Sequence, residues 1–381
     1  MIIAIDARSL EEHKTGINRY LSGLLRYWKN NKQHKFILYF KDEIPNDDLL
    51  KSDNFELKLL KNSFKFSSNF FFQHFLLPYN LKKDKANFFF SPFYLKPIYC
   101  SIKSAIVLHD ISYEAHPEWF DFKSKIILKL LSKFSAKTTD LIFTVSNYSK
   151  SEIVKCYKIN PDKITVTHLG VDSNIVGGDK KLSVQRDAQL LEYVKLDLNS
   201  KFILCVGSMF SRRHVPEIIE AFEKIANKYK DYQLLIIGKN HTHPFVDINN
   251  KIKTANNNLG RKAIIHLDFV EEEELLLFYS SCNISIYLSD YEGFGLPIIE
   301  AQFFGKPVIT SYNSSLIEVG GDSVEFVRNN GVEEIYNSLN EIISDENYKN
   351  RLVELGNKNV GRFSWEKCAD KTLEKILNIK Y

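Results

Sequence analysis

The sequence predicts an α/β protein of two domains, each built on a parallel sheet flanked by helices. The chain has 381 residues, which is more than one ordinary hydrophobic core organises. Apolar runs of strand length alternate with amphipathic stretches of helix length along most of the chain. One stretch, residues 173–200, carries glycines and charges without that alternation, and we expect it to be a linker.

The first domain is expected to span residues 1–172. Its predicted strands are 2–6, 36–40, 55–60, 87–91, 104–108, 141–145 and 164–169. Its predicted helices are 17–28, 118–137 and 149–157. This alternation is typical of a Rossmann-like domain, in which crossover helices join parallel strands.

The second domain is expected to span residues 201–362 and to repeat the same architecture. Its predicted strands are 202–206, 234–237, 263–269, 284–288 and 308–310. Its predicted helices are 216–229, 271–280 and one that begins near residue 296. The remaining segment, 363–381, is predicted to be a helix, because it has apolar residues at helical spacing: Trp365, Ala369, Leu373 and Ile376.

The composition is that of a soluble globular protein, with 44% apolar residues, 26% charged residues and a net charge of +4. We expect no nucleic-acid partner. No apolar run approaches the roughly 20 residues that span a bilayer, and Met1–Asp6 lacks a basic leader. Five cysteines have no metal-ligand spacing, so we expect a reducing, cytoplasmic compartment: Cys100, Cys156, Cys205, Cys282 and Cys368.

The charge is unevenly distributed. Residues 1–170 hold 26 Lys+Arg and 17 Asp+Glu, a net of +9, which leaves −5 for the rest of the chain. A basic half suits an anionic membrane surface or a phosphate, although a lysine-rich coding bias explains it equally well. The segment Phe64–Tyr79 adds many phenylalanines near lysines. It is predicted either to dock on a membrane or to pack in the core or around an acceptor pocket.

The stretch 289–300 is the most specific pattern in the chain. It follows a predicted strand and contains Gly293 and Gly295 before a helix expected to begin near Leu296. Glycines let backbone N–H groups approach a ligand closely, and a helix N-terminus favours an anion such as a phosphate. Gly305 is expected to end the helix in a left-handed conformation.

Two carboxylates accompany this turn. Glu292 stands at its mouth, and Glu300 lies one helical turn beyond Leu296. The pair is therefore placed to accept hydrogen bonds from different hydroxyl groups of one ligand. Taken singly, each glutamate is more often a helix cap or a solvated residue, but their spacing around Gly-Phe-Gly-Leu-Pro favours function.

Four further residues are candidates for ligand contact. Arg212 and Arg213 fall between a predicted strand and a helix, where paired guanidinium groups can bind a diphosphate, although an Arg-Arg pair is also common on solvated surfaces. His109 follows a predicted strand at its carboxyl end, where open α/β sheets bind ligands; the alternative is a structural histidine. Gly16 precedes the first predicted helix and brings amides near a ligand.

These residues resemble the retaining glycosyltransferases of family 4, which have the GT-B fold. The resemblance rests mainly on Tyr291–Glu300 and Gly305–Val308, and it extends to residues 6–8, 15–20, 109–110 and 212–213. It implies two Rossmann-like domains that face each other across a cleft, the first for the acceptor and the second for the donor. It also implies that the C-terminal helix crosses back to the first domain.

The resemblance assigns a role to each candidate residue. It implies that the donor diphosphate is bound by Gly16, Arg212, Arg213, Gly295 and Leu296. It implies that the donor sugar is bound by His109, Glu292, Gly293, Phe294 and Gly295, with His109 and Glu292 catalytic, and the nucleoside by Val270 and Glu300. Because these residues fall in both domains, closure is expected to complete the site.

The sequence departs from the family pattern at four positions. Leu288 stands where proline is common, and Phe303 and Phe304 are bulkier than usual, which bears on packing against the neighbouring helix. Arg213 stands where lysine is usual, so the charge is kept but its geometry differs.

The expected reaction is transfer of a hexose, with retention, from a nucleoside diphosphate sugar to a lipid-linked or saccharide acceptor in cell-surface polysaccharide synthesis such as that of lipopolysaccharide or O-antigen. Mannose, from GDP-mannose, is the first candidate.

The chain has no Asp-x-Asp triplet, so we expect no metal and no other cofactor. A dinucleotide-dependent oxidoreductase is disfavoured, because Gly-x-Gly-x-x-Gly is missing after the first strand. A catalytically inactive partner subunit stays open, although His109, Glu292 and Glu300 are all present.

Overall fold

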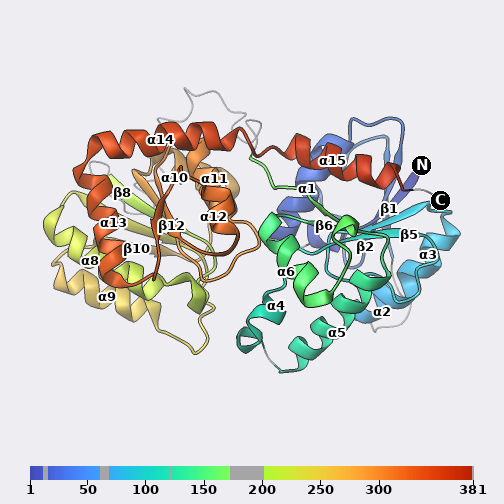
Figure 1. Ribbon diagram of the computed structural model, residues 1–381, viewed down its shortest axis with the longest axis horizontal. Helices are drawn as coiled ribbons and strands as arrows, with labels where there is room; N and C mark the ends of the chain where they lie inside the picture. Colours follow the sequence, from blue (N-terminus) through green and yellow to red (C-terminus); the bar gives the residue numbers. More distant parts are fainter. Residues whose placement is uncertain (12–15, 61–67, 121, 172–200, 380–381) are drawn as a thin grey trace. The chain divides into compact units, whose positions relative to one another are not determined.

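The chain forms two compact units, each with a parallel sheet covered by helices (Figure 1). Unit 1 comprises Met1–Gly170 and Ser364–Tyr381, and unit 2 comprises Val171–Phe363. The computed structural model describes residues 1–11, 16–60, 68–120, 122–171 and 201–379. The predicted linker, 173–200, lies outside the described residues.

Unit 1 is built on a seven-stranded sheet with the order β3-β2-β1-β4-β5-β6-β7, in which all neighbours are parallel. Its strands are β1 Ile2–Asp6, β2 Lys35–Phe40, β3 Phe55–Leu59, β4 Phe88–Ser91, β5 Lys103–Val107, β6 Leu141–Thr144 and β7 Ile164–Val166. The strand order reverses direction between β1 and β4, and ligands of open α/β sheets bind beside such a point.

The helices of unit 1 include several short pieces. The longer ones are α1 Gly16–Trp28, α3 Leu77–Lys83, α5 Phe122–Thr138, α6 Asn147–Tyr157 and α15 Trp365–Leu377. The short ones are η1 Arg8–Leu10, η2 Asp48–Leu50, α2 Asn69–Phe71, the π-helical η3 Phe72–Leu76, α4 Ser112–Ala115, η4 Pro117–Trp119 and η5 Pro161–Lys163.

The prediction of one helix over residues 118–137 is wrong at its start. Pro117 opens a separate 3-10 turn, η4, and Phe120 is extended, with φ −119° and ψ 145°. An extended residue cannot continue a helix, so α5 begins only at Phe122. The predicted start of the helix lies in η4 instead. The short helix α4 precedes η4 and follows the loop that carries His109.

The C-terminal helix α15 packs on α1, as predicted (Figure 1). The Trp28 indole N–H donates to the Ala369 carbonyl at 3.1 Å. A Cβ atom on Gly23 would lie 2.4 Å from the Trp365 ring, so only glycine allows this close approach. The chain leaves unit 1 after Gly170 and returns at Ser364, and these two crossing points lie against each other, because a Cβ on Gly170 would lie 2.0 Å from the Trp365 amide nitrogen.

Unit 2 is built on a six-stranded parallel sheet with the order β10-β9-β8-β11-β12-β13. Its strands are β8 Lys201–Val206, β9 Tyr232–Ile237, β10 Ile264–Leu267, β11 Ile284–Tyr287, β12 Val308–Ser311 and β13 Glu325–Val327. Its helices are η7 Ser211–Arg213, α8 Val215–Lys228, α9 Ile248–Asn258, α10 Glu272–Ser281, α11 Leu296–Phe303, α12 Ser314–Gly320, α13 Val332–Ser344 and α14 Glu346–Val360. The order reverses between β8 and β11, which brings the loops after these two strands together.

Candidate active site

The glycine turn of unit 2 forms as predicted. Gly295 has φ 111°, and a Cβ there would lie 2.7 Å from the Leu316 Cδ2 atom, so backbone conformation and packing both require glycine. Helix α11 begins at Leu296, with proline in its first turn. Gly305, just beyond its end, has φ 66°, which confirms the predicted left-handed termination.

Glu292 is held by a serine of its own loop and by two serines at the start of α12. The Ser289 hydroxyl donates to Glu292 Oε1 at 2.8 Å, and the Glu292 backbone N–H donates to the Ser314 hydroxyl at 3.1 Å. The Ser315 hydroxyl donates to the Glu292 carbonyl at 2.8 Å. The backbone of Glu292 is therefore fixed by α12, and its carboxylate is oriented by Ser289.

Arg212 and Arg213 lie beside Glu292. The distances to Glu292 Oε1 are 3.7 Å from Arg212 Nε and 3.2 Å from Arg213 Nη2. The Arg213 guanidinium also stacks 4.2 Å above the centre of the Tyr287 ring. The Asp290 backbone N–H donates to the Arg212 carbonyl at 3.0 Å, which ties the loop after β8 to the loop after β11.

Arg213 retains unused hydrogen-bonding capacity. Its Nε and Nη1 atoms are buried, and neither makes a hydrogen bond to any of the described residues. Buried N–H groups are almost always paired, and leaving one unpaired costs about 1–3 kcal/mol. Two such groups on a cation, near the N-terminus of α11, make a site suited to an anion.

His214 and Asp290, which the sequence did not single out, interact beside the loop after β8 that carries Arg212 and Arg213. His214 Nε2 lies 2.6 Å from Asp290 Oδ1, and Asn330 Nδ2 donates to the same oxygen at 3.2 Å. Burial alone would lower the pKa of His214, but the hydrogen bond to Asp290 and the charges of Asp290 and Glu217 raise it above the ordinary value. The protonated form of the imidazole is therefore stabilised relative to the neutral form.

Glu300 is oriented by a buried tyrosine. The Tyr279 hydroxyl donates to Glu300 Oε2 at 2.9 Å, and the Tyr279 ring stacks on Phe304 at 6.3 Å with an interplanar angle of 6°. The bulky Phe304 is thus accommodated and supports the donor that positions the carboxylate. Val270 lies half-buried in the loop between β10 and α10.

His109 lies in unit 1, just beyond the carboxyl end of β5. Its Nε2 atom is 3.0 Å from the Pro92 carbonyl, and its ring meets the edge of Tyr20 at a centroid distance of 5.0 Å. Burial lowers the pKa of His109 to about 4, and the Pro92 carbonyl opposes this only in part. Because a carbonyl only accepts, Nε2 carries the proton, and Nδ1 is an acceptor at neutral pH.

The predicted site residues therefore form two groups. Unit 2 brings together Arg212, Arg213, Glu292 and the turn that contains Gly293, Phe294, Gly295 and Leu296. Unit 1 holds His109 and Gly16, which is the exposed first residue of α1, one helical turn before Tyr20.

Known families match both halves of the chain. Residues 15–174 match the family described as Glycosyltransferase Family 4, and residues 190–359 match the family described as Glycosyl transferases group 1. The chain is 27% identical over 272 residues to the O-antigen chain mannosyltransferase B of Escherichia coli, which covers 71% of this chain and 69% of that protein. It is 23% identical over 283 residues to the serotype-specific mannosyltransferase WbdA of Escherichia coli, but this match spans only 33% of WbdA.

The fold is also found among solved structures. The crystal structure of Anabaena Alr3699/HepE in complex with UDP and glucose superposes with a TM-score of 0.75 over 99% of both chains, at 14% identity. The fold and site define a transferase with two Rossmann-like domains, as predicted for GT-B. The chain belongs to the family 4 glycosyltransferases.

Proposed function

We propose that this enzyme transfers a hexose, with retention, from a nucleoside diphosphate sugar to a lipid-linked or saccharide acceptor in cell-surface polysaccharide synthesis. The observation that carries this proposal is the buried Arg213 guanidinium, whose Nε and Nη1 atoms lack acceptors among the described residues while Nη2 is paired with Glu292. A diphosphate supplies oxygen acceptors for the N–H groups of these two nitrogen atoms.

The proposed chemistry follows from where charge develops. When the bond between the sugar and the diphosphate breaks, negative charge accumulates on the leaving phosphate. Arg212, Arg213 and the N-terminus of α11 are the groups that we expect to stabilise it. Glu300 is proposed to accept hydrogen bonds from the ribose hydroxyls near Val270, and Gly293, Phe294 and Gly295 to contact the sugar together with Glu292.

The donor is tested with a panel of nucleotides. Two relatives are named mannosyltransferases, which favours GDP-mannose, whereas HepE was solved with UDP and glucose, which makes UDP-glucose the main competitor. Calorimetry with GDP, UDP and their sugar conjugates on the full chain should show one nucleotide bound at least tenfold more tightly than the others. Binding of none of them would overturn the proposed donor class.

We expect turnover without a metal. The support is the arrangement of Arg212 and Arg213, which supplies two positive charges where a metal ion would otherwise neutralise a diphosphate. Activity should survive a chelator. Loss of activity in chelator that magnesium or manganese restores would contradict this part of the proposal.

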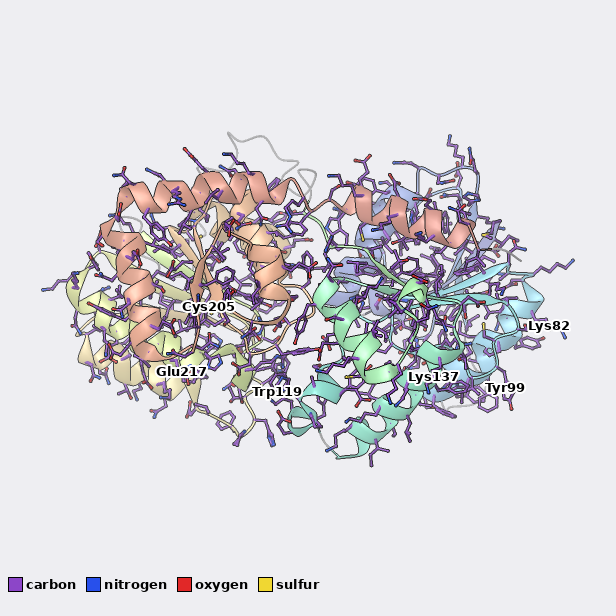
Figure 2. All side chains as sticks on the ribbon, viewed as in Figure 1. Lys82, Tyr99, Trp119, Lys137, Cys205 and Glu217 are labelled. Carbon is purple, nitrogen blue, oxygen red and sulfur yellow. The ribbon has the colours of Figure 1, made fainter. Side chains whose placement is uncertain are left out.

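The acceptor side is proposed to dock on an anionic membrane. In the segment Phe64–Tyr79, Phe72 and Leu77 are buried, whereas Phe70, Phe75 and Tyr79 are each more than half exposed; Phe64 and Phe66 lie outside the described residues. Helix α5 adds exposed apolar side chains between lysines: Ile126, Ile127, Leu130 and Phe134. Figure 2 shows Lys82, Tyr99 and Lys137 at the surface of the same unit.

Apolar side chains between lysines are typical of interfacial membrane contacts. Among the helices that the structure describes, none combines the length and apolar character of a membrane span. Flotation with anionic vesicles at low salt should recover the wild-type protein, and Leu130→Ser combined with Phe75→Ser should reduce recovery severalfold. Phe245→Ser, at a still more exposed position of unit 2, is the control. A wild-type protein that ignores anionic vesicles would contradict the proposal.

A further inference from the structure

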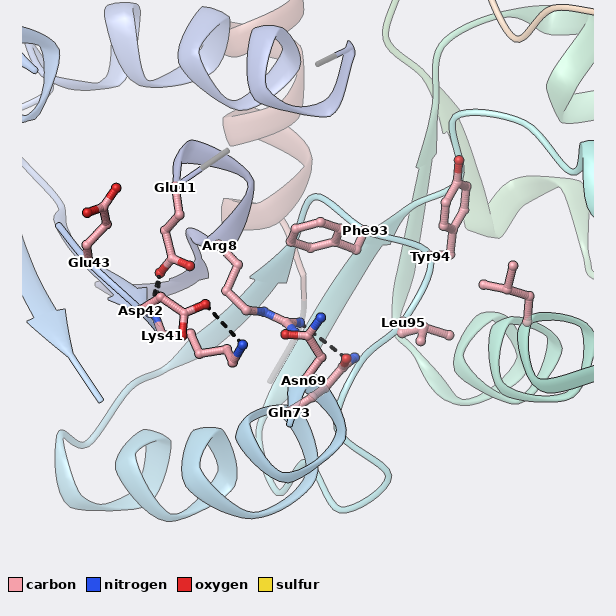
Figure 3. Close-up of a pocket in the computed structure, with 11 residues that line it drawn as sticks. Arg8, Glu11, Lys41, Asp42, Glu43, Asn69, Gln73, Phe93, Tyr94 and Leu95 are labelled. Atoms are coloured by element: carbon pink, nitrogen blue, oxygen red, sulfur yellow. Dashed lines mark hydrogen bonds and ion pairs between the residues drawn. The ribbon is translucent and has the colours of Figure 1, made fainter. Parts of the chain in front are cut away.

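Unit 1 contains a pocket of about 470 Å³ that includes none of the site residues predicted from the sequence. It is lined by the segments that follow β1, β2 and β4, by α2 and η3, and by Leu128 of α5 (Figure 3). Its volume lies within the roughly 300–1,000 Å³ typical of small-ligand sites. The pocket lies beside the carboxyl ends of β1 and β4, where the strand order reverses.

Arg8 is fixed and electrically compensated within this pocket. Its Nε and Nη2 atoms donate to the two carboxylate oxygens of the buried Asp6, at 2.9 and 2.6 Å. Its guanidinium also lies 4.8 Å from the centre of the Phe72 ring and 5.3 Å from that of Phe93. Arg8 therefore acts as a rigid support with its charge already paired.

Gln73 presents a donor without an acceptor. Its side chain is 95% buried, and its Oε1 atom accepts from Arg8 Nη2 at 3.2 Å (Figure 3). This contact fixes the amide orientation, because the flipped amide would place two donors together. Across the described part of the chain, no acceptor reaches the buried Nε2 atom. Such a donor lining a pocket indicates that a ligand oxygen belongs there.

The charges of the pocket disfavour an anionic ligand. Its lining includes two basic side chains, Arg8 and Lys41, and three acidic ones, Glu11, Asp42 and Glu43. Lys41 is paired with Asp42 at 3.0 Å, and Arg8 with Asp6. Among the described residues, the lining of the pocket therefore has no surplus positive charge with which to hold a phosphate.

The polar groups that line the pocket suit a ligand with hydroxyl groups. Glu11 Oε1 accepts from the backbone N–H groups of Lys41 and Asp42, which fixes the carboxylate and leaves Oε2 as an acceptor. Asn69 adds a second amide, and Phe93 supplies an apolar ring (Figure 3). Fixed carboxylate and amide groups beside an aromatic ring match the hydroxyls and the C–H face of a sugar.

We propose that this pocket binds an uncharged sugar residue of the acceptor. Gln73 Nε2–H donates to an oxygen of that sugar, Glu11 accepts from one of its hydroxyls, and Phe93 contacts its C–H face. The assignment to the acceptor rests on the proposed glycosyltransferase function, whereas the preference for a neutral sugar rests on the pocket alone.

Gln73→Glu is the sharpest variant, because it keeps an oxygen for Arg8 and replaces the N–H donor by a carboxylate oxygen that can only accept. Gln33→Glu, an exposed position in the same unit, makes the identical chemical change away from the pocket. Saturation-transfer NMR on the full chain is measured with methyl α-mannoside, methyl α-glucoside, methyl α-galactoside, N-acetylglucosamine and α-linked mannobiose. Inorganic phosphate and mannose 6-phosphate serve as anionic probes.

The wild-type protein and Gln33→Glu should bind at least one neutral sugar, and Gln73→Glu should bind it about tenfold more weakly or not at all. Nucleotide affinity, measured by calorimetry, should be equal in all three proteins. A failure of the donor proposal would appear in this measurement, whereas a failure of the sugar-pocket proposal would appear in the sugar titrations. Unchanged sugar binding by Gln73→Glu would overturn the inference. So would a wild-type protein that binds no sugar of the panel, or one that prefers the phosphates.

Discussion

Arg213 in unit 2 and Gln73 in unit 1 both hold buried N–H donors for which the described residues offer no acceptor, but their surroundings differ. Arg213 is a cation flanked by a second arginine, with one carboxylate between them. Gln73 is a neutral amide beside an arginine whose charge Asp6 already compensates. The contrast indicates that unit 2 is built for a charged ligand and unit 1 for a neutral one.

The largest expected effect is that of Arg213→Ala on nucleotide binding. Loss of two charge-assisted hydrogen bonds, at roughly 1.5–3 kcal/mol each, should weaken nucleoside diphosphate binding about a hundredfold or more. The nucleotide affinity of Arg213→Lys should lie between those of Arg213→Ala and the wild type, because lysine keeps the charge and loses the planar pair of donors. Arg328→Ala, at an exposed position of unit 2, is the control. Equal nucleotide affinity in all four proteins would contradict the inference that unit 2 is built for a charged ligand.

Glu300→Ala should weaken nucleotide binding about tenfold to a hundredfold, because a charge-assisted hydrogen bond to ribose contributes roughly 1.5–3 kcal/mol. Tyr279→Phe leaves the carboxylate in place and removes only its positioning hydrogen bond, so the loss should be severalfold. Calorimetry with the free nucleoside diphosphate measures both. A larger loss in Tyr279→Phe than in Glu300→Ala would show that the carboxylate does not contact the nucleotide.

His109→Ala should lower kcat at least about tenfold, equivalent to roughly 1.4 kcal/mol, with nearly normal nucleotide affinity. The reason is that His109 belongs to unit 1, whereas the proposed nucleotide contacts belong to unit 2. Because burial lowers the pKa of His109 to about 4, titration of this histidine should not contribute to the pH dependence of the wild-type rate between pH 6 and 8. Lost nucleotide affinity with intact kcat would contradict this prediction, because it would show that His109 contacts the nucleotide and does not act in the transfer step.

The smallest expected effect is a pH-dependent change in stability at His214. Its pKa is raised in the folded protein, so its ion pair with Asp290 stabilises the fold at pH values below the unfolded pKa and loses that effect as pH rises through the folded pKa. His214→Gln should therefore cost at most about 1 kcal/mol at pH 5.5 and clearly less at pH 9. Urea unfolding at both pH values measures this, and a greater cost at pH 9 would contradict the assigned direction.

The local structure of the candidate site in unit 2 could be predicted largely from the sequence, because the parts of its glycine turn are close together in the chain. Gly293, Gly295, Leu296 and Gly305 lie within one turn and one helix, and their backbone requirements show in the residue types themselves. Arg213 could be placed beside Glu292 only through the order of strands, which the resemblance supplied and the residues alone did not.

The pocket of unit 1 could not be predicted in the same way. Arg8, Gln73 and Phe93 come from three separate segments, and each residue type is ordinary in its own context. For Phe64–Tyr79 the sequence left membrane docking and burial open. The segment contains a π-helical turn at Phe72–Leu76. Within this turn Phe72 is buried, whereas Phe75, three residues later, is exposed.

The return of α15 to unit 1 has a consequence for how the protein is made. Unit 2 is inserted within the sequence of unit 1, whose last helix begins only at Trp365. Trp28 and Gly23 on α1 pack against residues that are synthesised only after the whole of unit 2. Domains usually fold as units in the order of their synthesis. Here the second unit is complete before the first, because the first still lacks α15 when unit 2 has been synthesised.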